Sequence, residues 1–212
     1  TRQEAVTLLG VDPERIVVIP EGYDHDLFKP CSALQGAAIK QKYGLPDRYL
    51  LFVGAHEPRK NIDLLLKARG LTRNTVPLVW AGWSGWGEQQ HGDMLCLGYV
   101  PDHDLAGLYS GAAAFVYPSL YEGFGLPVLE AMACGCPVIC SRTASLPEVA
   151  GDAALYCDPG NADELADCID QAIEDTNVRE AALLKGPKRA AGFSWQLAAQ
   201  QTIEVFKNAA SG

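Results

Sequence analysis

One stretch of the sequence has the residue types and spacing of an anion-binding site. It runs from Glu122 to Glu130 and reads EGFGLPVLE. The apolar run over 112–117 before it is typical of a buried strand, and the apolar run over 126–133, with Pro127 in its first turn, predicts a helix. A strand, a turn and a helix in this order direct backbone N–H groups and the positive end of the helix dipole at one point, which suits a phosphate.

Two glycines and a carboxylate in this stretch indicate how a ligand would be held. Gly123 and Gly125 let the backbone approach a bound molecule where a Cβ would block it. Glu130 lies between apolar neighbours in the second turn of the expected helix, where an unpartnered carboxylate is costly. A pair of ribose hydroxyls would satisfy it. An ordinary turn, and a buried glutamate held by backbone N–H groups or an arginine, are the alternatives that these residues leave open.

Two adjacent cations follow an earlier strand. The apolar run over 49–53 predicts a buried strand. Arg59 and Lys60 come after it, directly before Asn61, which we expect to be the N-cap of a helix over 62–69. Two cations between the carboxyl end of a strand and the start of a helix suit a diphosphate. A solvated surface pair is the alternative.

Short apolar runs alternate with helical patterns along the whole chain. The expected strands cover 16–19, 49–53, 76–81, 94–97, 112–117, 137–140 and 153–156. The expected helices cover 1–9, 32–43, 62–69, a segment from Asp102, 126–133, 161–175, 178–191 and a last segment capped by Ser194. This alternation predicts an α/β fold, a Rossmann-like parallel sheet with helices on both faces.

In such a sheet, ligands bind at the carboxyl ends of the strands. Four expected loops with suitable chemistry share that edge, at Gly22, 54–60, 98–101 and 118–125. Their common placement favours a ligand site over unrelated surface loops. The tract Trp83–Gly87 reads as a further loop, either an interface or a lid.

Composition limits the classes of partner. The chain has 212 residues, a net charge of −9 and a pI near 4.9, which argue against nucleic acid or an anionic membrane as a general partner. No apolar run approaches the roughly 18 residues of a membrane span. Seven dispersed cysteines without paired C-x-x-C motifs indicate reduced thiols in a cytoplasmic protein. A first residue of Thr1, with no visible signal peptide, suggests a fragment of a longer chain.

An ordered set of motifs resembles one family over nearly the whole chain. The motifs are Ile19–Gly22, Phe52–Gly54, Arg59–Asn61, Leu97–Val100, Pro118–Ser119, Glu122-x7-Glu130, Ala131–Val138 and Pro147–Val149. Together they resemble the carboxyl-terminal, donor-binding domain of the GT-B glycosyltransferases, specifically the retaining family 4 (group 1). The resemblance implies that residues 1–212 form one half of a GT-B fold, a nucleotide-sugar-binding domain with a C-terminal helix at about 194–210.

The resemblance also implies roles for individual residues. Arg59 and Lys60 would hold the donor diphosphate and stabilise charge on the departing nucleotide, and Glu122 would contact the donor sugar. The donor-binding positions would be Gly22, the backbone at Tyr99 and Val100 along the base, the backbone of Gly123, Phe124 and Gly125, the N–H of Leu126, and Glu130 at the ribose.

Proteins of the resembled class need no metal and no cofactor beyond the nucleotide-diphosphate sugar, which is the substrate. Two Asp-x-Asp sequences could suggest a metal, at Asp24–Asp26 and Asp102–Asp104. We interpret Asp24 instead as part of the turn after Gly22 and Asp102 as a helix N-cap.

The chain also departs from the resembled family. The acceptor-binding domain that precedes this region is absent, so the donor-binding half alone is expected to be inactive, and membrane association of the full enzyme is not visible here. Glu21 stands where an Asn is commoner. The tract His56–Asn61 resembles mannosyltransferase-like members and favours GDP-mannose. A stand-alone nucleotide-sugar-binding module is the main alternative, whereas a phosphorylase or epimerase of this fold would need a pyridoxal-phosphate lysine or carboxylate set that the sequence does not clearly show.

Overall fold

The computed structural model describes residues 2–82 and 94–211, and the Trp83–Gly87 tract lies outside them. Within the described residues, six parallel strands form one sheet in the order β3-β2-β1-β4-β5-β6. The strands are β1 (Leu50–Val53), β2 (Leu78–Ala81), β3 (Leu95–Gly98), β4 (Ala114–Tyr117), β5 (Val138–Ser141) and β6 (Ala154–Cys157). The predicted α/β fold with a parallel sheet is confirmed.

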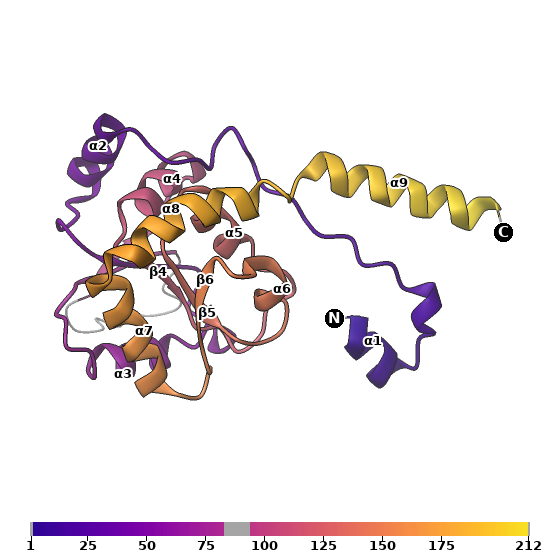
Figure 1. Cartoon of the computed structure of the whole chain (residues 1–212), viewed down its shortest axis with the longest axis horizontal. Coiled ribbons are helices and arrows are strands. Elements are labelled where there is room, and N and C mark those ends of the chain that lie inside the picture. The colour runs from indigo at the N-terminus through magenta and orange to yellow at the C-terminus, as the bar shows by residue number, and fades with distance from the viewer. Residues whose placement is uncertain (1, 83–93, 212) are drawn as a thin grey trace.

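Helices connect the strands and cover both faces of the sheet (Figure 1). The connecting helices are α3 (Ile62–Arg69), α4 (Asp102–Gly111), α5 (Leu126–Ala133) and α6 (Leu146–Ala150). Outside this series lie α1 (Arg2–Leu9), α2 (Ala33–Tyr43), α7 (Ala162–Glu174), α8 (Thr176–Ala190) and α9 (Trp195–Ser211), with short 3-10 turns at Pro13–Arg15 and Pro58–Lys60. The sequence predicts all of these α-helices except α6, which is five residues long and too short for a periodic pattern.

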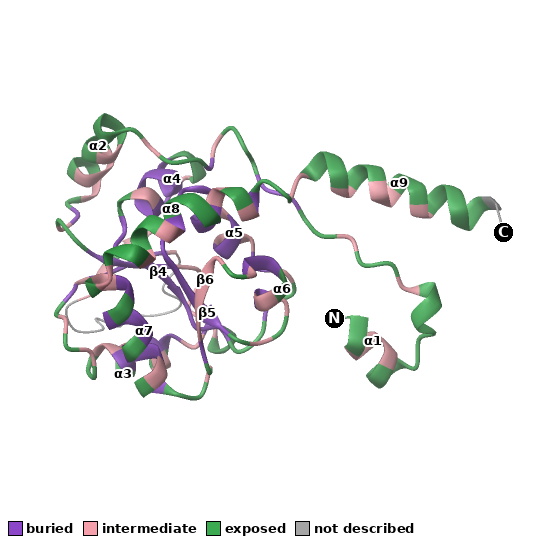
Figure 2. Ribbon diagram, viewed as in Figure 1, coloured by how far each residue is buried: buried purple, intermediate pink, exposed green. Residues whose placement is uncertain are grey.

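Alternate residues along each strand divide the core into two layers, because successive side chains point to opposite faces of a sheet. Leu50 and Phe52 of β1 pack toward α3 and α7, whereas Leu51 packs toward the side of α4 and α5. Figure 2 shows the central strands and the inner sides of these helices as buried. Burial on both faces explains why these strands read as continuous apolar runs rather than as alternating ones.

The strand order reverses between β1 and β4. The chain moves outward from β1 to β3, returns to pair β4 beside β1, and then continues outward to β6. In open α/β sheets this switch point leaves a crevice at the carboxyl ends of the two central strands, where ligands bind. The loops after β1 and β4 therefore frame the candidate site.

The predicted strand over 16–19 is wrong. Residues 16–21 are extended chain without sheet pairing, and Val17 and Val18 are exposed. A short apolar run forms a strand only where a neighbouring strand offers hydrogen bonds, and this segment lies outside the compact body, away from the sheet (Figure 1). Gly22 therefore does not follow a strand. It lies where the chain crosses the start of α9, and a Cβ there would be 2.0 Å from the Trp195 nitrogen.

One predicted helix cap is wrong, and another is confirmed in position only. Asn61 is the N-cap residue of α3, as predicted, but it lies in a left-handed conformation (φ 55°) and its side chain makes no capping hydrogen bond. The N-cap of α4 is Pro101, so Asp102 is the first residue of the helix. Propensity places both residues at a helix start, but tertiary contacts decide what the side chains bind. The predicted roles of Ser194 and Asp24 are confirmed, since each side chain accepts hydrogen bonds from nearby backbone N–H groups.

Helix α9 and the first twenty residues lie outside the compact body (Figure 1). Trp195, Ile203 and Phe206 of α9 are each at least half exposed. No helix among the described residues is long and apolar enough to cross a membrane. Trp195, Ile203 and Phe206 thus form an exposed apolar surface on α9 within the part of the chain that the structure describes.

Helix α8 packs closely on α5, the helix that carries Glu130. Gly186 of α8 permits this contact, because a Cβ at this position would lie 2.7 Å from the carbonyl oxygen of Met132. We expect Gly186→Ala to lower the free energy of unfolding by about 1–3 kcal/mol through overpacking. Gly36→Ala is the matched control, since its Cβ meets nothing within 4 Å in α2 and should stabilise by about 0.5–1 kcal/mol. Urea unfolding of both variants measures this, and equal effects would contradict the packing argument.

Candidate functional site at the carboxyl ends of β1 and β4

Three hydrogen bonds to backbone carbonyls hold the loops at this edge together. The Leu120 N–H donates to the Arg59 carbonyl at 2.8 Å. The Asn61 side-chain amide donates to the Pro118 carbonyl at 3.0 Å and to the Pro159 carbonyl at 2.8 Å. The left-handed backbone at Asn61 directs the amide toward these carbonyls instead of toward its own helix. This residue ties three loops at the carboxyl edge into one unit.

Glu122 binds both predicted cations. Its Oε1 accepts from Lys60 Nζ at 2.9 Å, and its Oε2 accepts from Arg59 Nη1 at 2.9 Å. The side chains of Lys60 and Glu122 are each 8% exposed, whereas that of Arg59 is 45% exposed. The sequence predicts all three as site residues, and the structure brings them together in one cluster. The sequence does not predict that the Glu122 carboxylate bridges Arg59 and Lys60.

The surroundings of Glu122 keep its carboxylate ionised, whereas burial lowers the pKa of Lys60. Burial alone would raise the pKa of Glu122, but the hydrogen bond and charge of Lys60 outweigh it and hold the pKa below its ordinary value. Lys60 Nζ also contacts the hydroxyl of Tyr117, the last residue of β4. On the solvent side, Glu57 Oε2 pairs with Arg59 Nε at 2.7 Å, and both side chains are 45% exposed. An exposed pair of this kind contributes at most about 1 kcal/mol, so a stronger anion can replace Glu57 at little cost.

A serine on the next loop holds the glycine-bearing turn. The Ser145 hydroxyl lies 3.0 Å from the Glu122 carbonyl and 2.7 Å from the Phe124 carbonyl. Gly125 then enters α5 with a φ of 113°, a conformation that side chains rarely adopt. Pro127 has no N–H, and the Val128 N–H donates to the Gly125 carbonyl at 3.0 Å. The Leu126 N–H is therefore the donor in the first turn of α5 that has no acceptor among the described residues.

The structure places the other predicted donor-binding residues around this edge. Gly123 is exposed, and Leu126 is the first residue of α5. The Phe124 ring packs on Phe193 with centroids 5.8 Å apart. Of the two residues expected along the base, both in the loop after β3, Tyr99 is exposed and Val100 is buried.

Glu130 has one hydrogen-bond partner among the described residues. The Tyr109 hydroxyl of α4 donates to Glu130 Oε2 at 3.1 Å. Burial raises the pKa of Glu130 from 4.5 to about 7, the nearby charge of Asp102 adds to this, and the Tyr109 hydrogen bond opposes it. Neither an arginine nor a backbone N–H binds this carboxylate in the part of the chain that the structure describes. The alternative of a buried glutamate held by one of those groups is therefore not what the structure shows.

No group of three or more His, Cys, Asp or Glu side chains in the described ranges is arranged to hold a metal ion. All seven cysteines are free, as predicted, and five are buried. Cys96 of the edge strand β3 is the exposed one. Burial raises the pKa of Cys136 to about 12, which keeps this core thiol protonated.

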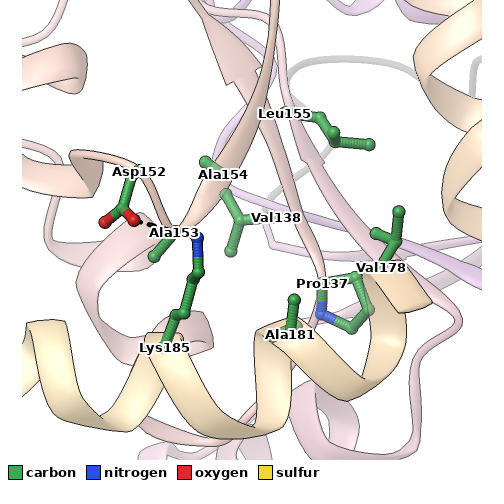
Figure 3. A pocket seen from close by; sticks show the side chains of 10 residues that line it. Pro137, Val138, Asp152, Ala153, Ala154, Leu155, Val178, Ala181 and Lys185 are labelled. Atoms are coloured by element: carbon green, nitrogen blue, oxygen red, sulfur yellow. Dashed lines mark hydrogen bonds and ion pairs between the residues drawn. The ribbon is translucent and has the colours of Figure 1, made fainter.

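A separate cavity of about 100 Å³ lies at the amino ends of β5 and β6, beneath α8 (Figure 3). Small apolar side chains line it, and Lys185 and Asp152 form an ion pair of 2.9 Å at its rim. It lies at the sheet edge opposite the site and holds no unpaired charge. We assign it to imperfect packing between α8 and the sheet.

Comparison with known proteins identifies the family. Residues 37–189 match the family described as glycosyl transferases group 1. The chain belongs to this family. It is 42% identical over 98% of its length to O-antigen chain mannosyltransferase B of Escherichia coli. The match covers 58% of that protein, so the chain spans little more than half the length of this relative.

Solved structures of larger proteins share the fold of this group 1 chain. Sucrose-phosphate synthase from Thermosynechococcus elongatus superposes with a TM-score of 0.81 at 26% identity, over 99% of this chain and 57% of that one. Anabaena HepE, in complex with UDP and glucose, superposes with a TM-score of 0.84 at 24% identity, over 97% of this chain and 60% of that one. These likenesses confirm the predicted fold, with GT-B structural neighbours.

Sequence reasoning missed four residues that position the site: Tyr109, Tyr117, Ser145 and the tertiary role of Asn61. Tyr109 and Tyr117 lie in apolar runs where a tyrosine reads as core. Glu130 is the one signal that could have indicated the role of Tyr109, because a carboxylate in an apolar helix needs a buried hydrogen-bond donor. Nothing local to Ser145 indicates that it binds carbonyls some twenty residues earlier in the chain.

The raised pKa of Glu130 predicts a pH-dependent stability. The folded protein retains this proton up to about pH 7 and the unfolded chain releases it near pH 4.5, so stability falls as pH rises through this window. The difference corresponds to about 3 kcal/mol. Glu130→Gln removes this loss, so its stability relative to the natural chain should be higher at pH 8 than at pH 5.

Urea unfolding at both pH values measures this difference, with Glu180→Gln, an exposed glutamate on α8, as the control. Identical pH dependence in Glu130→Gln and the natural chain would show that Glu130 does not titrate abnormally.

Proposed function

We propose that this chain is the donor-binding half of a retaining hexosyltransferase. It takes the hexosyl donor as a nucleotide-diphosphate sugar, with GDP-mannose as the favoured donor, and needs no metal. The observation that carries the proposal is the cluster of Arg59, Lys60 and Glu122 at the strand-order switch point, beside the free N-terminus of α5. Cations and helix N–H groups at one edge suit a diphosphate.

The side chains have distinct roles in this proposal. Cleavage of the sugar–phosphate bond develops negative charge on the diphosphate, and fixed cations stabilise that charge more in the transition state than in the ground state. Glu122 and Tyr117 hold the Lys60 ammonium in place. Arg59 is more exposed and would contact the diphosphate from the solvent side of the site. Glu122 would accept hydrogen bonds from the sugar hydroxyls while it holds the cations.

The nucleoside would extend from this cluster along the sheet edge. Glu130 lies one turn into α5, behind the turn that meets the phosphates, and its carboxylate suits the ribose hydroxyls. The loop at Tyr99 and Val100, two strands away from β1, would meet the base. The lean toward GDP-mannose is supported by the tract His56–Asn61 and by the similarity to a mannosyltransferase.

The rest of the protein would supply the acceptor side. The chain spans 58% of the E. coli relative, and α9 carries an apolar surface outside the compact body. We propose that α9 packs on an amino-terminal acceptor domain. Amide hydrogens of α9 should then exchange more slowly in a longer protein containing that domain than in this chain alone. Equal exchange rates in both would contradict the docking of α9.

Calorimetric titration of the chain with GDP, UDP and ADP, with and without magnesium, tests the proposed function. We expect selective binding of one nucleotide, GDP for a mannose donor, with the same affinity in both conditions. Binding that requires magnesium would contradict the metal-independent site, and preference for UDP or ADP would exclude GDP-mannose. Failure of all three to bind either the chain or the longer protein would overturn the proposal.

Arg59→Ala and Lys60→Ala test the phosphate contacts. Each substitution should lower the affinity for the nucleoside diphosphate roughly 10–100-fold, which is the range expected for the loss of a charged hydrogen bond. The affinity for the nucleoside should change much less. Arg73→Ala removes the same charge from the opposite edge of the sheet and is the matched control. Equal losses for diphosphate and nucleoside would argue against phosphate contacts at Arg59 and Lys60.

A further inference from the structure

The only hydrogen-bond partner that the structure describes for Glu130 is a tyrosine from a different helix. Tyr109 lies in α4, after β3, whereas Glu130 lies in α5, after β4. Their 3.1 Å bond uses Oε2 of the carboxylate, and Oε1 has no partner among the described residues. One oxygen is thus held by the protein, and the other is left for a ligand.

The Tyr109 side chain, which donates this hydrogen bond, is held in place by its surroundings. Tyr109 is completely buried, and its ring packs edge-on against Phe115 with centroids 5.3 Å apart and against Phe28 at 6.2 Å. Burial and the charge of Glu130 raise the pKa of Tyr109, so the hydroxyl stays protonated. A buried phenol of this kind can only donate to Glu130 from one direction.

A glutamate terminus would otherwise be free to turn, because its last torsion is broad. Holding Oε2 fixes the plane of the carboxylate and therefore the direction of Oε1. A fixed carboxylate loses little rotational freedom when a ligand binds, and such preorganisation increases affinity.

We propose that Tyr109 is a positioning residue that makes the nucleotide site selective for ribose over deoxyribose, by holding Oε2 of Glu130 so that Oε1 faces the ribose hydroxyls. The proposal rests on the proposed function, in which Glu130 meets the ribose. It assigns Tyr109 a role beyond the core packing that its burial alone would suggest.

The chain provides a matched control for the loss of a tyrosine hydroxyl. The Tyr43 hydroxyl donates to Asp104 Oδ2 at 2.5 Å, which also links a tyrosine to a buried carboxylate of α4. Tyr43 projects from α2, on the other side of α4 from α5. Tyr43→Phe and Tyr109→Phe therefore remove similar bonds, but only the second bond involves Glu130.

The experiment compares a nucleoside diphosphate, with the base that the natural chain prefers, and its 2′,3′-dideoxy analogue by calorimetry at pH 8. We expect the natural chain to bind the ribose form roughly 10–100-fold more tightly, as hydrogen bonds to a charged group predict. Tyr109→Phe should weaken the ribose form about 5–10-fold and leave the dideoxy form within about twofold. Tyr43→Phe should leave the ratio unchanged.

The outcomes separate the positioning role from the proposed function. If the natural chain prefers ribose and Tyr109→Phe retains the same preference, the positioning role is wrong and the ribose contact stands. Equal weakening of both forms by Tyr109→Phe would indicate a merely structural tyrosine. If the natural chain binds both forms equally, or Glu130→Gln retains the full preference, the ribose contact fails and the role of Tyr109 fails with it.

Discussion

The ion pair between Lys60 and Glu122 is the interaction on which the geometry of this edge depends. It joins the loop after β1 to the loop after β4, across the point where the strand order reverses. Two charges that are both buried repay their desolvation only when every polar atom finds a partner. Here Tyr117 and Arg59 complete the set. Removing either member would leave the other charge buried alone, which typically costs about 3–5 kcal/mol. Substrate chemistry and folding thus place demands on the same residues.

The rest of the fold supports this pair indirectly. Asn61 and Ser145 hold the backbones of the two loops, α8 packs behind α5, and the double-sided core fixes the ends of β1 and β4. The two charged side chains come from short connections between strand and helix, so small movements of either helix would alter their separation. Rigid packing of α5 therefore contributes to the site as directly as the charged groups do.

The fold and the chemically obvious residues could be predicted from the sequence, since apolar runs and charged residues after them are local signals. Six of the seven predicted strands, the cations and both glutamates follow from such signals. The failures share one cause, which is that tertiary contacts override local preference. Residues 16–19 are apolar without a strand to pair with. Asn61 is the N-cap residue of α3, as predicted, but its side chain binds distant carbonyls, and Ser145 and Tyr109 reach partners that are distant in the sequence or on another helix.

The exposure of Cys96 gives the protein a natural attachment point for a reporter group. Four of the other six thiols are less than 3% exposed, and Cys96 lies on the outermost strand, two residues before the glycine that leads into the Tyr99 loop. A thiol-reactive fluorophore would attach there in preference to the core positions. Its emission would report local changes at the sheet edge that the nucleoside base is expected to occupy, without any engineered residue.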